Sequence, residues 1–152
     1  MNRQFFIFTD GSAIGNPGPA GWAAIVIHGT SRQEISGSIP WSTITEMELR
    51  AAVEALRLTP VGARIELRSD SELLINGMRY RAFRWRRSGW RNSRGFEVQH
   101  QELWRELLAL SANRSIRWLW VKGHSGHPVQ TRADALAHQA ARALRLREKA
   151  AA

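Results

Sequence analysis

The chain has 152 residues, of which 22 are lysine or arginine and 13 are acidic, giving a formal net charge of +9 at pH 7. This length fits one domain with a sizeable core, so we expect a single domain over residues 1–152. The absence of cysteine excludes disulfides and thiolate metal sites. Strand-like sequence begins close to the N-terminus, and no apolar run reaches the roughly 18 residues of a membrane span. We therefore expect a cytoplasmic protein with no signal peptide and no membrane segment.

The N-terminal part of the chain predicts three strands. Residues 5–8 are apolar and bulky, which is typical of a short buried strand. This run stops at Thr9-Asp10-Gly11-Ser12, so we expect Asp10 at or near the carboxyl end of the strand, before a connection rich in glycine and proline. Two more strands are predicted over residues 21–28 and 32–39, and the short link between them indicates an antiparallel hairpin.

Helices and strands alternate over the rest of the chain. Thr43 and Glu46 have the spacing of a capping box and predict the start of a helix that ends before Pro60. The elements expected after it are a strand over 64–68, a helix from Gly77 to Gly89, a loop to about Phe96, a helix over 102–110, a strand over 115–121 and a helix over about 129–147. This order predicts an α/β domain with one mixed sheet.

Four acidic residues stand at the edges of these predicted elements. The chain has only three aspartates, Asp10, Asp70 and Asp134, and Glu48 borders the buried face of its helix. If the first and fourth strands are neighbours, their ends bring Asp10 and Asp70 together, and such a cluster repels itself unless cations neutralise it. Two Mg²⁺ ions about 4 Å apart can activate a water and stabilise the leaving oxygen of an in-line phosphoryl displacement. Spacing alone also allows ordinary roles, with Glu48 solvated and Asp134 favoured by the helix dipole.

Most of the positive charge lies in one segment. Between residues 79 and 94 the chain has seven arginines and no acid, so this window carries +7 of the net +9. Arginine binds phosphate in a bidentate way and stacks on bases, which indicates a nucleic-acid partner. Three tryptophans, Trp85, Trp90 and Trp104, lie in or near the segment, either to stack on nucleic acid or to pack it onto the body.

Several segments together resemble the type 1 ribonuclease H family. The matching segments are TDGSAIGNPGPAGWA (9–23), MELRAAVEAL (47–56), SDS (69–71), GW (89–90) and WVKGHSGHP (120–128). The resemblance implies an α/β, ribonuclease H-like fold: a five-stranded mixed sheet, its first three strands antiparallel, flanked by helices, with a basic protrusion at about 79–98. It also implies a monomer that hydrolyses the RNA strand of RNA/DNA hybrid duplexes endonucleolytically, leaving 5′-phosphate and 3′-hydroxyl ends.

The same resemblance implies roles for individual residues. Asp10, Glu48, Asp70 and Asp134 match the family's metal-binding carboxylates, for two Mg²⁺ ions that Mn²⁺ would replace. His124 matches a loop histidine that assists proton transfer or product release, and a histidine titrates near neutral pH. The expected substrate contacts are Gly11, Ser12, Ala13, Asn16, Thr43, Thr45, Ser71, Glu72, Arg84, Trp85, Arg86, Arg87 and Trp90.

Departures from the family pattern lie among the expected substrate contacts and beside the last helix. Ile44 and Thr45 stand where many relatives carry paired asparagines, and Glu72 stands where glutamine is common. Other departures are Arg81, Arg84, Gln130 and Thr131. We expect them to alter affinity, metal optimum or cleavage preference and to leave the chemistry intact.

Two other functions fit parts of the sequence. A module that binds hybrids or structured RNA without cutting needs only the arginine-rich segment. A different nuclease on the same sheet, acting on DNA, would need the carboxylates but not a hybrid substrate.

Overall fold

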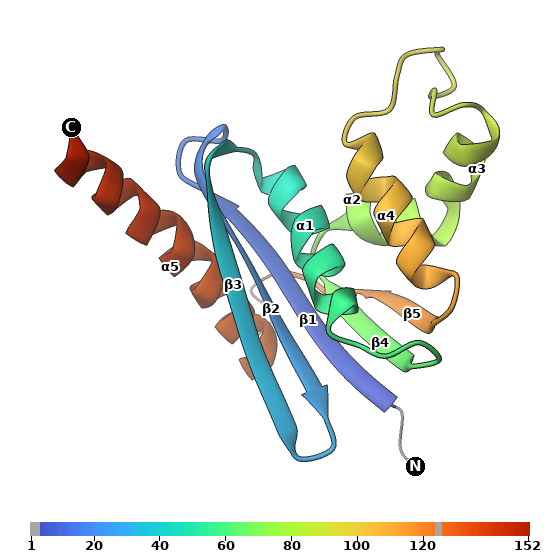
Figure 1. Cartoon of the computed structure of the whole chain (residues 1–152), viewed down its shortest axis with the longest axis horizontal. Coiled ribbons are helices and arrows are strands. Elements are labelled where there is room, and N and C mark those ends of the chain that lie inside the picture. The colour runs from blue at the N-terminus through green and yellow to red at the C-terminus, as the bar shows by residue number, and fades with distance from the viewer. Residues whose placement is uncertain (1–3, 124–125) are drawn as a thin grey trace.

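The computed structural model describes residues 4–123 and 126–152, and its centre is a five-stranded sheet in the order β3-β2-β1-β4-β5 (Figure 1). The strands are β1 (Gln4–Ala13), β2 (Gly18–His28), β3 (Ser31–Ser42), β4 (Arg64–Ser69) and β5 (Ser115–Trp120). β1 pairs antiparallel with β2 and parallel with β4, while β2–β3 is antiparallel and β4–β5 is parallel. The mixed sheet predicted from the sequence is therefore confirmed.

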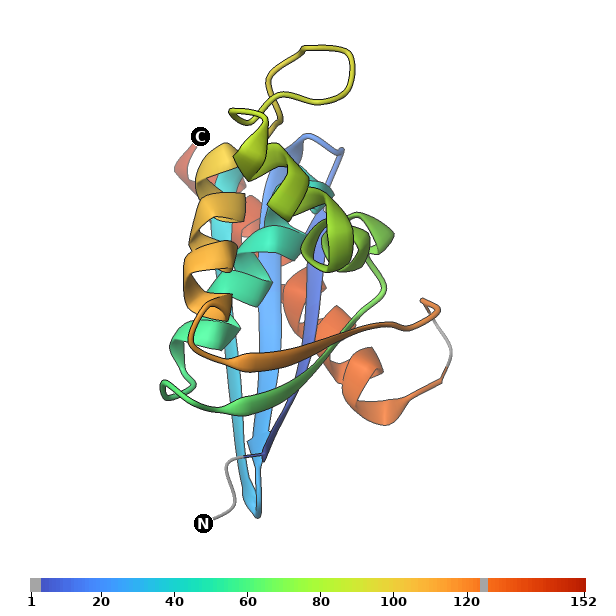
Figure 2. The same ribbon diagram turned by 90° about the vertical axis from the view of Figure 1, so that its right-hand side faces the viewer.

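Helices cover both faces of this sheet. They are α1 (Ile44–Arg57), α2 (Glu72–Asn76), the π-helix η1 (Gly77–Arg81), α3 (Ala82–Arg87), α4 (Gln101–Ser111) and α5 (Pro128–Ala151). α1 and α4 lie on one side of the sheet and α5 on the other, as Figures 1 and 2 show from two directions. Among the described residues, no helix combines the length and the apolar character needed to cross a membrane.

The arginine-rich segment begins in a helical stretch that starts earlier than the sequence predicts. The expected start was Gly77, but α2 begins at Glu72 and continues through η1 into α3. Ser71 caps α2, since its hydroxyl accepts a hydrogen bond from the Leu74 N–H at 3.2 Å. A side-chain cap of this kind satisfies a free backbone donor and so fixes where the helix begins.

The two faces of the sheet bury very different amounts of apolar side chain. Alternation along β1 sends Ile7 into the large core beneath α1 and α4, and Phe8 toward α5. The large core includes Leu49, Leu56, Leu67, Leu74, Trp104 and Leu107. On the α5 side the buried cluster consists of Phe8, Ile25 and Ala133, with Ile27, Val129 and Leu136 partly buried against it. The apolar cluster under α5 is therefore smaller than the one under α1 and α4.

The position of Asp10 differs from the prediction. β1 continues to Ala13, which pairs with Ala20 of β2, so Asp10 lies inside the strand and not at its end. The pairing of β1 with β4, however, stops at Phe8 opposite Arg68. Asp10 therefore lies just beyond the point where the two parallel strands separate, which leaves room for its carboxylate.

Two glycines allow helices to approach the sheet closely. A Cβ atom on Gly11 would lie 2.7 Å from the Glu48 nitrogen, so the glycine lets α1 contact β1. A Cβ atom on Gly21 would lie 2.2 Å from the Ala137 carbonyl oxygen, so the glycine lets α5 contact β2. Distances this short leave no room for a side chain.

We expect Gly21→Ala to destabilise the protein by about 1–3 kcal/mol, because the new methyl group forces α5 away from β2. Thermal unfolding followed by circular dichroism measures this loss. Gly29→Ala is the control: no atom lies within 4 Å of its added Cβ, and its cost is limited to the strain of a φ of +60°. An unchanged melting temperature for Gly21→Ala would contradict the close contact.

Candidate metal centre

Three carboxylates from separate elements meet beyond the point where β1 and β4 separate. Asp10 comes from β1, Glu48 from α1 and Asp70 from the residue after β4, and one oxygen of each lies within 4.8 Å of the others. Asp10 and Glu48 are only 3% and 6% exposed, and Asp70 is half-buried. The predicted meeting of Asp10 with Asp70 is confirmed, and Glu48 joins them.

Local hydrogen bonds position each of these acids. The Thr43 hydroxyl caps α1 by accepting from the Glu46 N–H at 3.2 Å, which sets the start of the helix that carries Glu48. The Gly11 N–H donates to Asp10 Oδ1 at 2.8 Å. The Trp120 indole N–H donates to the Asp70 carbonyl oxygen at 3.1 Å, so β5 holds the backbone of the third acid.

Burial and mutual repulsion make these acids hard to ionise without a cation. Burial, followed by the charge of Asp70, raises the pKa of Asp10 to about 7. Burial also raises the pKa of Glu48 well above its usual range, and the charges of Asp10 and Asp70 add to this shift. Glu48 Oε2 is buried and has no hydrogen-bond partner among the described residues. A donor set of carboxylate oxygens with an unpaired buried oxygen fits a hard divalent cation.

The fourth predicted carboxylate, Asp134, lies at the margin of this cluster. It is exposed on α5 and lies outside the group of oxygens within 4.8 Å of one another. Asp134 is near enough to Asp10 to add to the raised pKa of that carboxyl, after burial and the charge of Asp70. α5 therefore brings Asp134 to the edge of the cluster from the opposite face of the sheet.

The predicted loop histidine, His124, lies outside the described residues. The residue before it, Gly123, is described and lies against the cluster. A Cβ atom on Gly123 would be 3.1 Å from Asp70 Oδ2. The loop that follows β5 thus passes directly beside the third acid.

Some of the predicted substrate contacts surround the start of α1. Asn16 Oδ1 accepts from the Ile44 N–H at 3.0 Å, which joins the β1–β2 connection to this helix. Thr43 caps α1, and Thr45 is half-buried in its first turn. The backbone of the half-buried stretch Gly11, Ser12 and Ala13 continues β1 past Asp10.

The predicted contacts Ser71 and Glu72 begin α2 directly after Asp70. Ser71 is the half-buried N-cap of this helix, and its hydroxyl is engaged by the Leu74 N–H. Glu72 is exposed in the first helical turn. The structure thus places both residues next to the metal-centre acid, with Glu72 accessible from outside.

The arginine-rich segment presents its cations to solvent. Arg84, Arg86 and Arg87 are exposed on α3. A pocket of about 520 Å³ opens beside them, and no acid lines it. Its lining residues are Arg81, Arg84, Trp85, Ser88, Arg91, Asn92 and Ser93.

The tryptophans of this region pack onto the protein. Trp90 is only 4% exposed, and the Arg105 guanidinium lies 4.8 Å from its ring centroid. Trp85 is half-buried and meets Trp104 edge to face, with the ring centroids 5.3 Å apart. The sequence left two roles open for these tryptophans, stacking on nucleic acid and packing onto the body of the protein. The structure supplies packing partners for them.

Sequence reasoning missed two positions that support the cluster, Trp120 at Asp70 and Gln130 at Thr9. The Gln130 side-chain N–H donates to the Thr9 carbonyl oxygen at 3.0 Å, and Gln130 itself is buried. Neither contact has a signal in spacing or charge, because each joins residues far apart in the chain. The one sequence signal at Gln130 is its departure from the family pattern.

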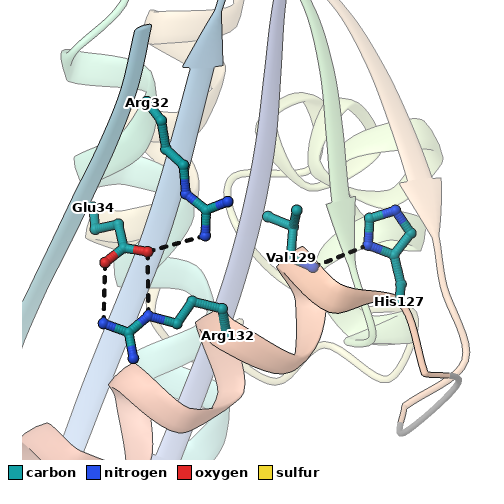
Figure 3. Close-up of polar contacts among 5 residues, drawn as sticks. All are labelled: Arg32, Glu34, His127, Val129 and Arg132. Carbon is teal, nitrogen blue, oxygen red and sulfur yellow. Dashed lines mark hydrogen bonds and ion pairs between the residues drawn. The ribbon is translucent and has the colours of Figure 1, made fainter.

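An exposed ion-pair group, also not anticipated, lies on the outer side of α5. Arg132 donates to both oxygens of Glu34 at 3.2 Å, and Arg32 donates to Oε2 of the same carboxylate at 3.1 Å (Figure 3). The group joins α5 to β3. Exposed pairs of this type contribute little to stability, about 0–1 kcal/mol.

Comparisons of the sequence and of the fold with known proteins agree on one family. The sequence profile of RNase H matches residues 2–142. The ribonuclease H of Moorella thermoacetica is 44% identical over 147 residues, which cover 96% of this chain and 97% of that protein. LC9-RNase H1, described as a type 1 RNase H with the type 2 active-site motif, superposes with a TM-score of 0.84 at 26% identity, covering 95% of this chain and 74% of its own.

A second solved structure, LC11-RNase H1 in complex with an RNA/DNA hybrid, shares the fold. It has a TM-score of 0.64 at 22% identity and covers 97% of this chain and 99% of its own. The profile match and the close relative both extend over most of this sequence. With the five-stranded sheet and the acidic cluster in place, these likenesses identify the chain as a member of the type 1 ribonuclease H family.

Proposed function

We propose that this protein is a metal-dependent endoribonuclease that hydrolyses the RNA strand of RNA/DNA hybrids. The observation that carries the proposal is the meeting of Asp10, Glu48 and Asp70 within 4.8 Å, two of them buried, in a chain of this family. Acids placed against a polyanionic substrate would weaken binding, so a protein that only bound hybrids would gain nothing from them. The products would carry 5′-phosphate and 3′-hydroxyl ends.

The metal would be Mg²⁺, two ions in the presence of substrate, with Mn²⁺ as a substitute. Asp10, Glu48, Asp70 and Asp134 would hold the ions, and the ions would supply an activated water and charge neutralisation at the scissile phosphate. The chain's own residues keep the acids in place: Gly11 by its N–H to Asp10, and Trp120 by its indole to the Asp70 carbonyl. His124 would assist proton transfer or product release.

Two surfaces would grip the duplex. The backbone of Gly11–Ala13 and the side chains of Asn16, Thr43, Thr45, Ser71 and Glu72 would contact the RNA strand, where 2′-hydroxyls across the shallow minor groove distinguish RNA from DNA. Arg84, Arg86 and Arg87, with Trp85 and Trp90 packed behind them, would contact phosphates of the DNA strand. This arrangement fixes the register of the duplex without reading its base sequence.

We also propose that the protein acts as a single-domain monomer in the cytoplasm. Support for a single domain is the continuous sheet, in which the first and the last strands belong to one layer. The proposed substrate arises where RNA is made and DNA is copied, which in bacteria is the cytoplasm. The relative from Moorella thermoacetica has nearly the same length as this chain.

The substrate prediction is tested with end-labelled RNA/DNA, RNA/RNA and DNA/DNA duplexes of one sequence, each with Mg²⁺, Mn²⁺ or EDTA. We expect cutting only of the RNA strand in the hybrid, and only with metal. Asp10→Asn should lower the rate at least about a thousandfold, because it removes a ligand charge from the centre. Hybrid binding by this variant should persist, as measured by fluorescence anisotropy.

Each alternative has its own outcome in this panel. Tight hybrid binding with no cutting under any metal would make the protein a binding module. Cutting of the DNA duplex would indicate a different nuclease on the same sheet. Undiminished cleavage by Asp10→Asn would contradict the assignment of the metal centre.

The raised pKa of Asp10 predicts how stability changes with pH in the absence of metal. The folded protein binds the proton of Asp10 up to about pH 7 and the unfolded chain only to about 3.8, so ionising this group costs stability as the pH rises between these values. In EDTA at pH 8, Asp10→Asn should therefore melt several degrees above the wild type, about 5 °C. At pH 3 the two should melt together.

Added Mg²⁺ should reverse this order, because it stabilises the wild type and has fewer ligands in Asp10→Asn. Thermal unfolding at pH 3, 5 and 8, with EDTA or Mg²⁺, measures both effects. A variant less stable than the wild type in EDTA at pH 8 would show that Asp10 is not under electrostatic strain.

The arginines of α3 provide a separate prediction. Replacing Arg86 and Arg87 with alanine should weaken hybrid binding about tenfold at physiological salt and reduce the salt slope of binding by about two. The matched control is Arg145→Ala with Arg147→Ala, which removes the same charge from the exposed end of α5. Equal losses in the two variants would mean that net charge alone, and not the position of the α3 arginines, governs binding.

A further inference from the structure

Gln130 makes a buried polar contact between α5 and the strand that carries Asp10. Its side-chain N–H donates to the Thr9 carbonyl oxygen at 3.0 Å, and the residue is only 6% exposed. Thr9 precedes Asp10 and is the first residue of β1 beyond the pairing with β4, which ends at Phe8. The contact therefore lies where β1 leaves its parallel neighbour.

A polar side chain at this place does not improve the packing of the protein. Gln130 Oε1 is buried and accepts no hydrogen bond among the described residues, and the same is true of the Thr9 hydroxyl oxygen. Buried polar atoms without partners destabilise a fold, so an apolar side chain of the same size would be at least as stable here. The single donated hydrogen bond to Thr9 is what the glutamine adds.

Gln130 and Asp134 are four residues apart in α5, so they lie on the same side of the helix, one turn from each other. Asp134 lies near Asp10, since it adds to the raised pKa of that carboxyl. Gln130, one turn earlier in α5, is hydrogen-bonded to Thr9, the residue before Asp10. The helix is fixed to the strand directly beside the acid that it has to meet.

We propose that Gln130 is a positioning residue. Its hydrogen bond to the Thr9 carbonyl fixes the position of α5 relative to β1 and thereby places Asp134 for metal binding. This proposal rests on the proposed function and deepens it. The apolar cluster under α5 is small, with Phe8, Ile25 and Ala133 buried and Ile27, Val129 and Leu136 packed against them. Contacts of this kind have no fixed direction. A polar contact of defined length and direction supplies the missing constraint.

Two other residues at this end of α5 make contacts that do not involve Asp10 or the residue before it. His127 caps the helix by accepting from the Val129 N–H at 3.3 Å (Figure 3). Its ring also stacks on Phe8, with the ring centroids 5.0 Å apart, and these two contacts fix the first turn. Arg132 holds the outer side of the helix to Glu34 of β3. Gln130 bonds to the β1 backbone directly before Asp10, and on the other side His138 of α5 lies 3.4 Å from the Ser12 hydroxyl, two residues after Asp10. Of these two contacts, that of Gln130 is the buried one.

The test compares Gln130→Met, which keeps the size of the side chain and removes the donor, with Arg132→Ala, which removes the outer contact two residues away. Thermal unfolding is measured in EDTA and across a Mg²⁺ titration, which reports metal binding without any need for turnover. Hybrid cleavage is measured in parallel. We expect Gln130→Met to raise the Mg²⁺ concentration for half-maximal stabilisation about tenfold.

A merely structural role predicts different results. Then Gln130→Met would lower the melting temperature in EDTA and leave the Mg²⁺ midpoint unchanged, and this result would overturn the proposal. We expect instead an unchanged or higher melting temperature in EDTA, with KM for the hybrid unaltered. Arg132→Ala should leave the Mg²⁺ midpoint at the wild-type value.

A double-mutant cycle tests whether the effect passes through Asp134. In an Asp134→Asn background, Gln130→Met should produce no further shift of the Mg²⁺ midpoint. The same tenfold shift in both backgrounds would overturn the proposal. If Gln130→Met does not fold, Gln130→Asn, whose amide is one methylene too short to reach Thr9, takes its place in each measurement.

Failure of the proposed function would look different from failure of this inference. A wild type that binds Mg²⁺ but does not cut the hybrid would reject the function and leave the metal titration interpretable. A wild type that cuts, together with an unshifted midpoint in Gln130→Met, would reject the positioning role alone.

Discussion

The structure depends on the crowding of carboxylates that repel one another. Three of them lie within 4.8 Å, in surroundings where burial makes each charge costly. The fold holds them there with features that have no other evident use: a glycine where α1 meets β1, and the early separation of β1 from β4. A cluster of carboxylate oxygens of this kind suits a hard divalent cation, which would neutralise the repulsion.

The acids come from four separate segments of the chain. Asp10 lies on β1, Asp70 directly follows β4, Glu48 lies on α1, and Asp134 lies on α5 at the margin of the cluster. The arginines lie apart from these acids, on the helical segment that follows Asp70. The proposed binding of the duplex by these arginines would therefore be separable from chemistry at the acids, whereas the departures at Glu72 and Ile44 lie close to the acids themselves.

Periodicity and capping predicted most of the elements, because those signals are local. Thr43 caps α1 as predicted, while the start of α2 was missed, since a serine cap followed by an apolar run looks like the end of the preceding strand. The placing of Asp10 at a strand end was wrong because pairing to β2 extends β1 through Gly11. The meeting of Asp10 with Asp70 followed from strand order. The hydrogen bond from Gln130 to Thr9 could not be predicted, because it depends on how closely α5 packs against the sheet.

The apolar clusters on the two faces of the sheet differ in size, so the helices that cover the two faces differ in local stability. Glu48 is carried by α1, which packs on the large core, whereas Asp134 is carried by α5, which packs on the smaller apolar cluster. Local opening follows such differences, and amide hydrogens of a weakly packed helix exchange before those of the central strands. A local opening of α5 would separate Asp134 from Asp10, Glu48 and Asp70 while the sheet and α1 keep those three acids in place.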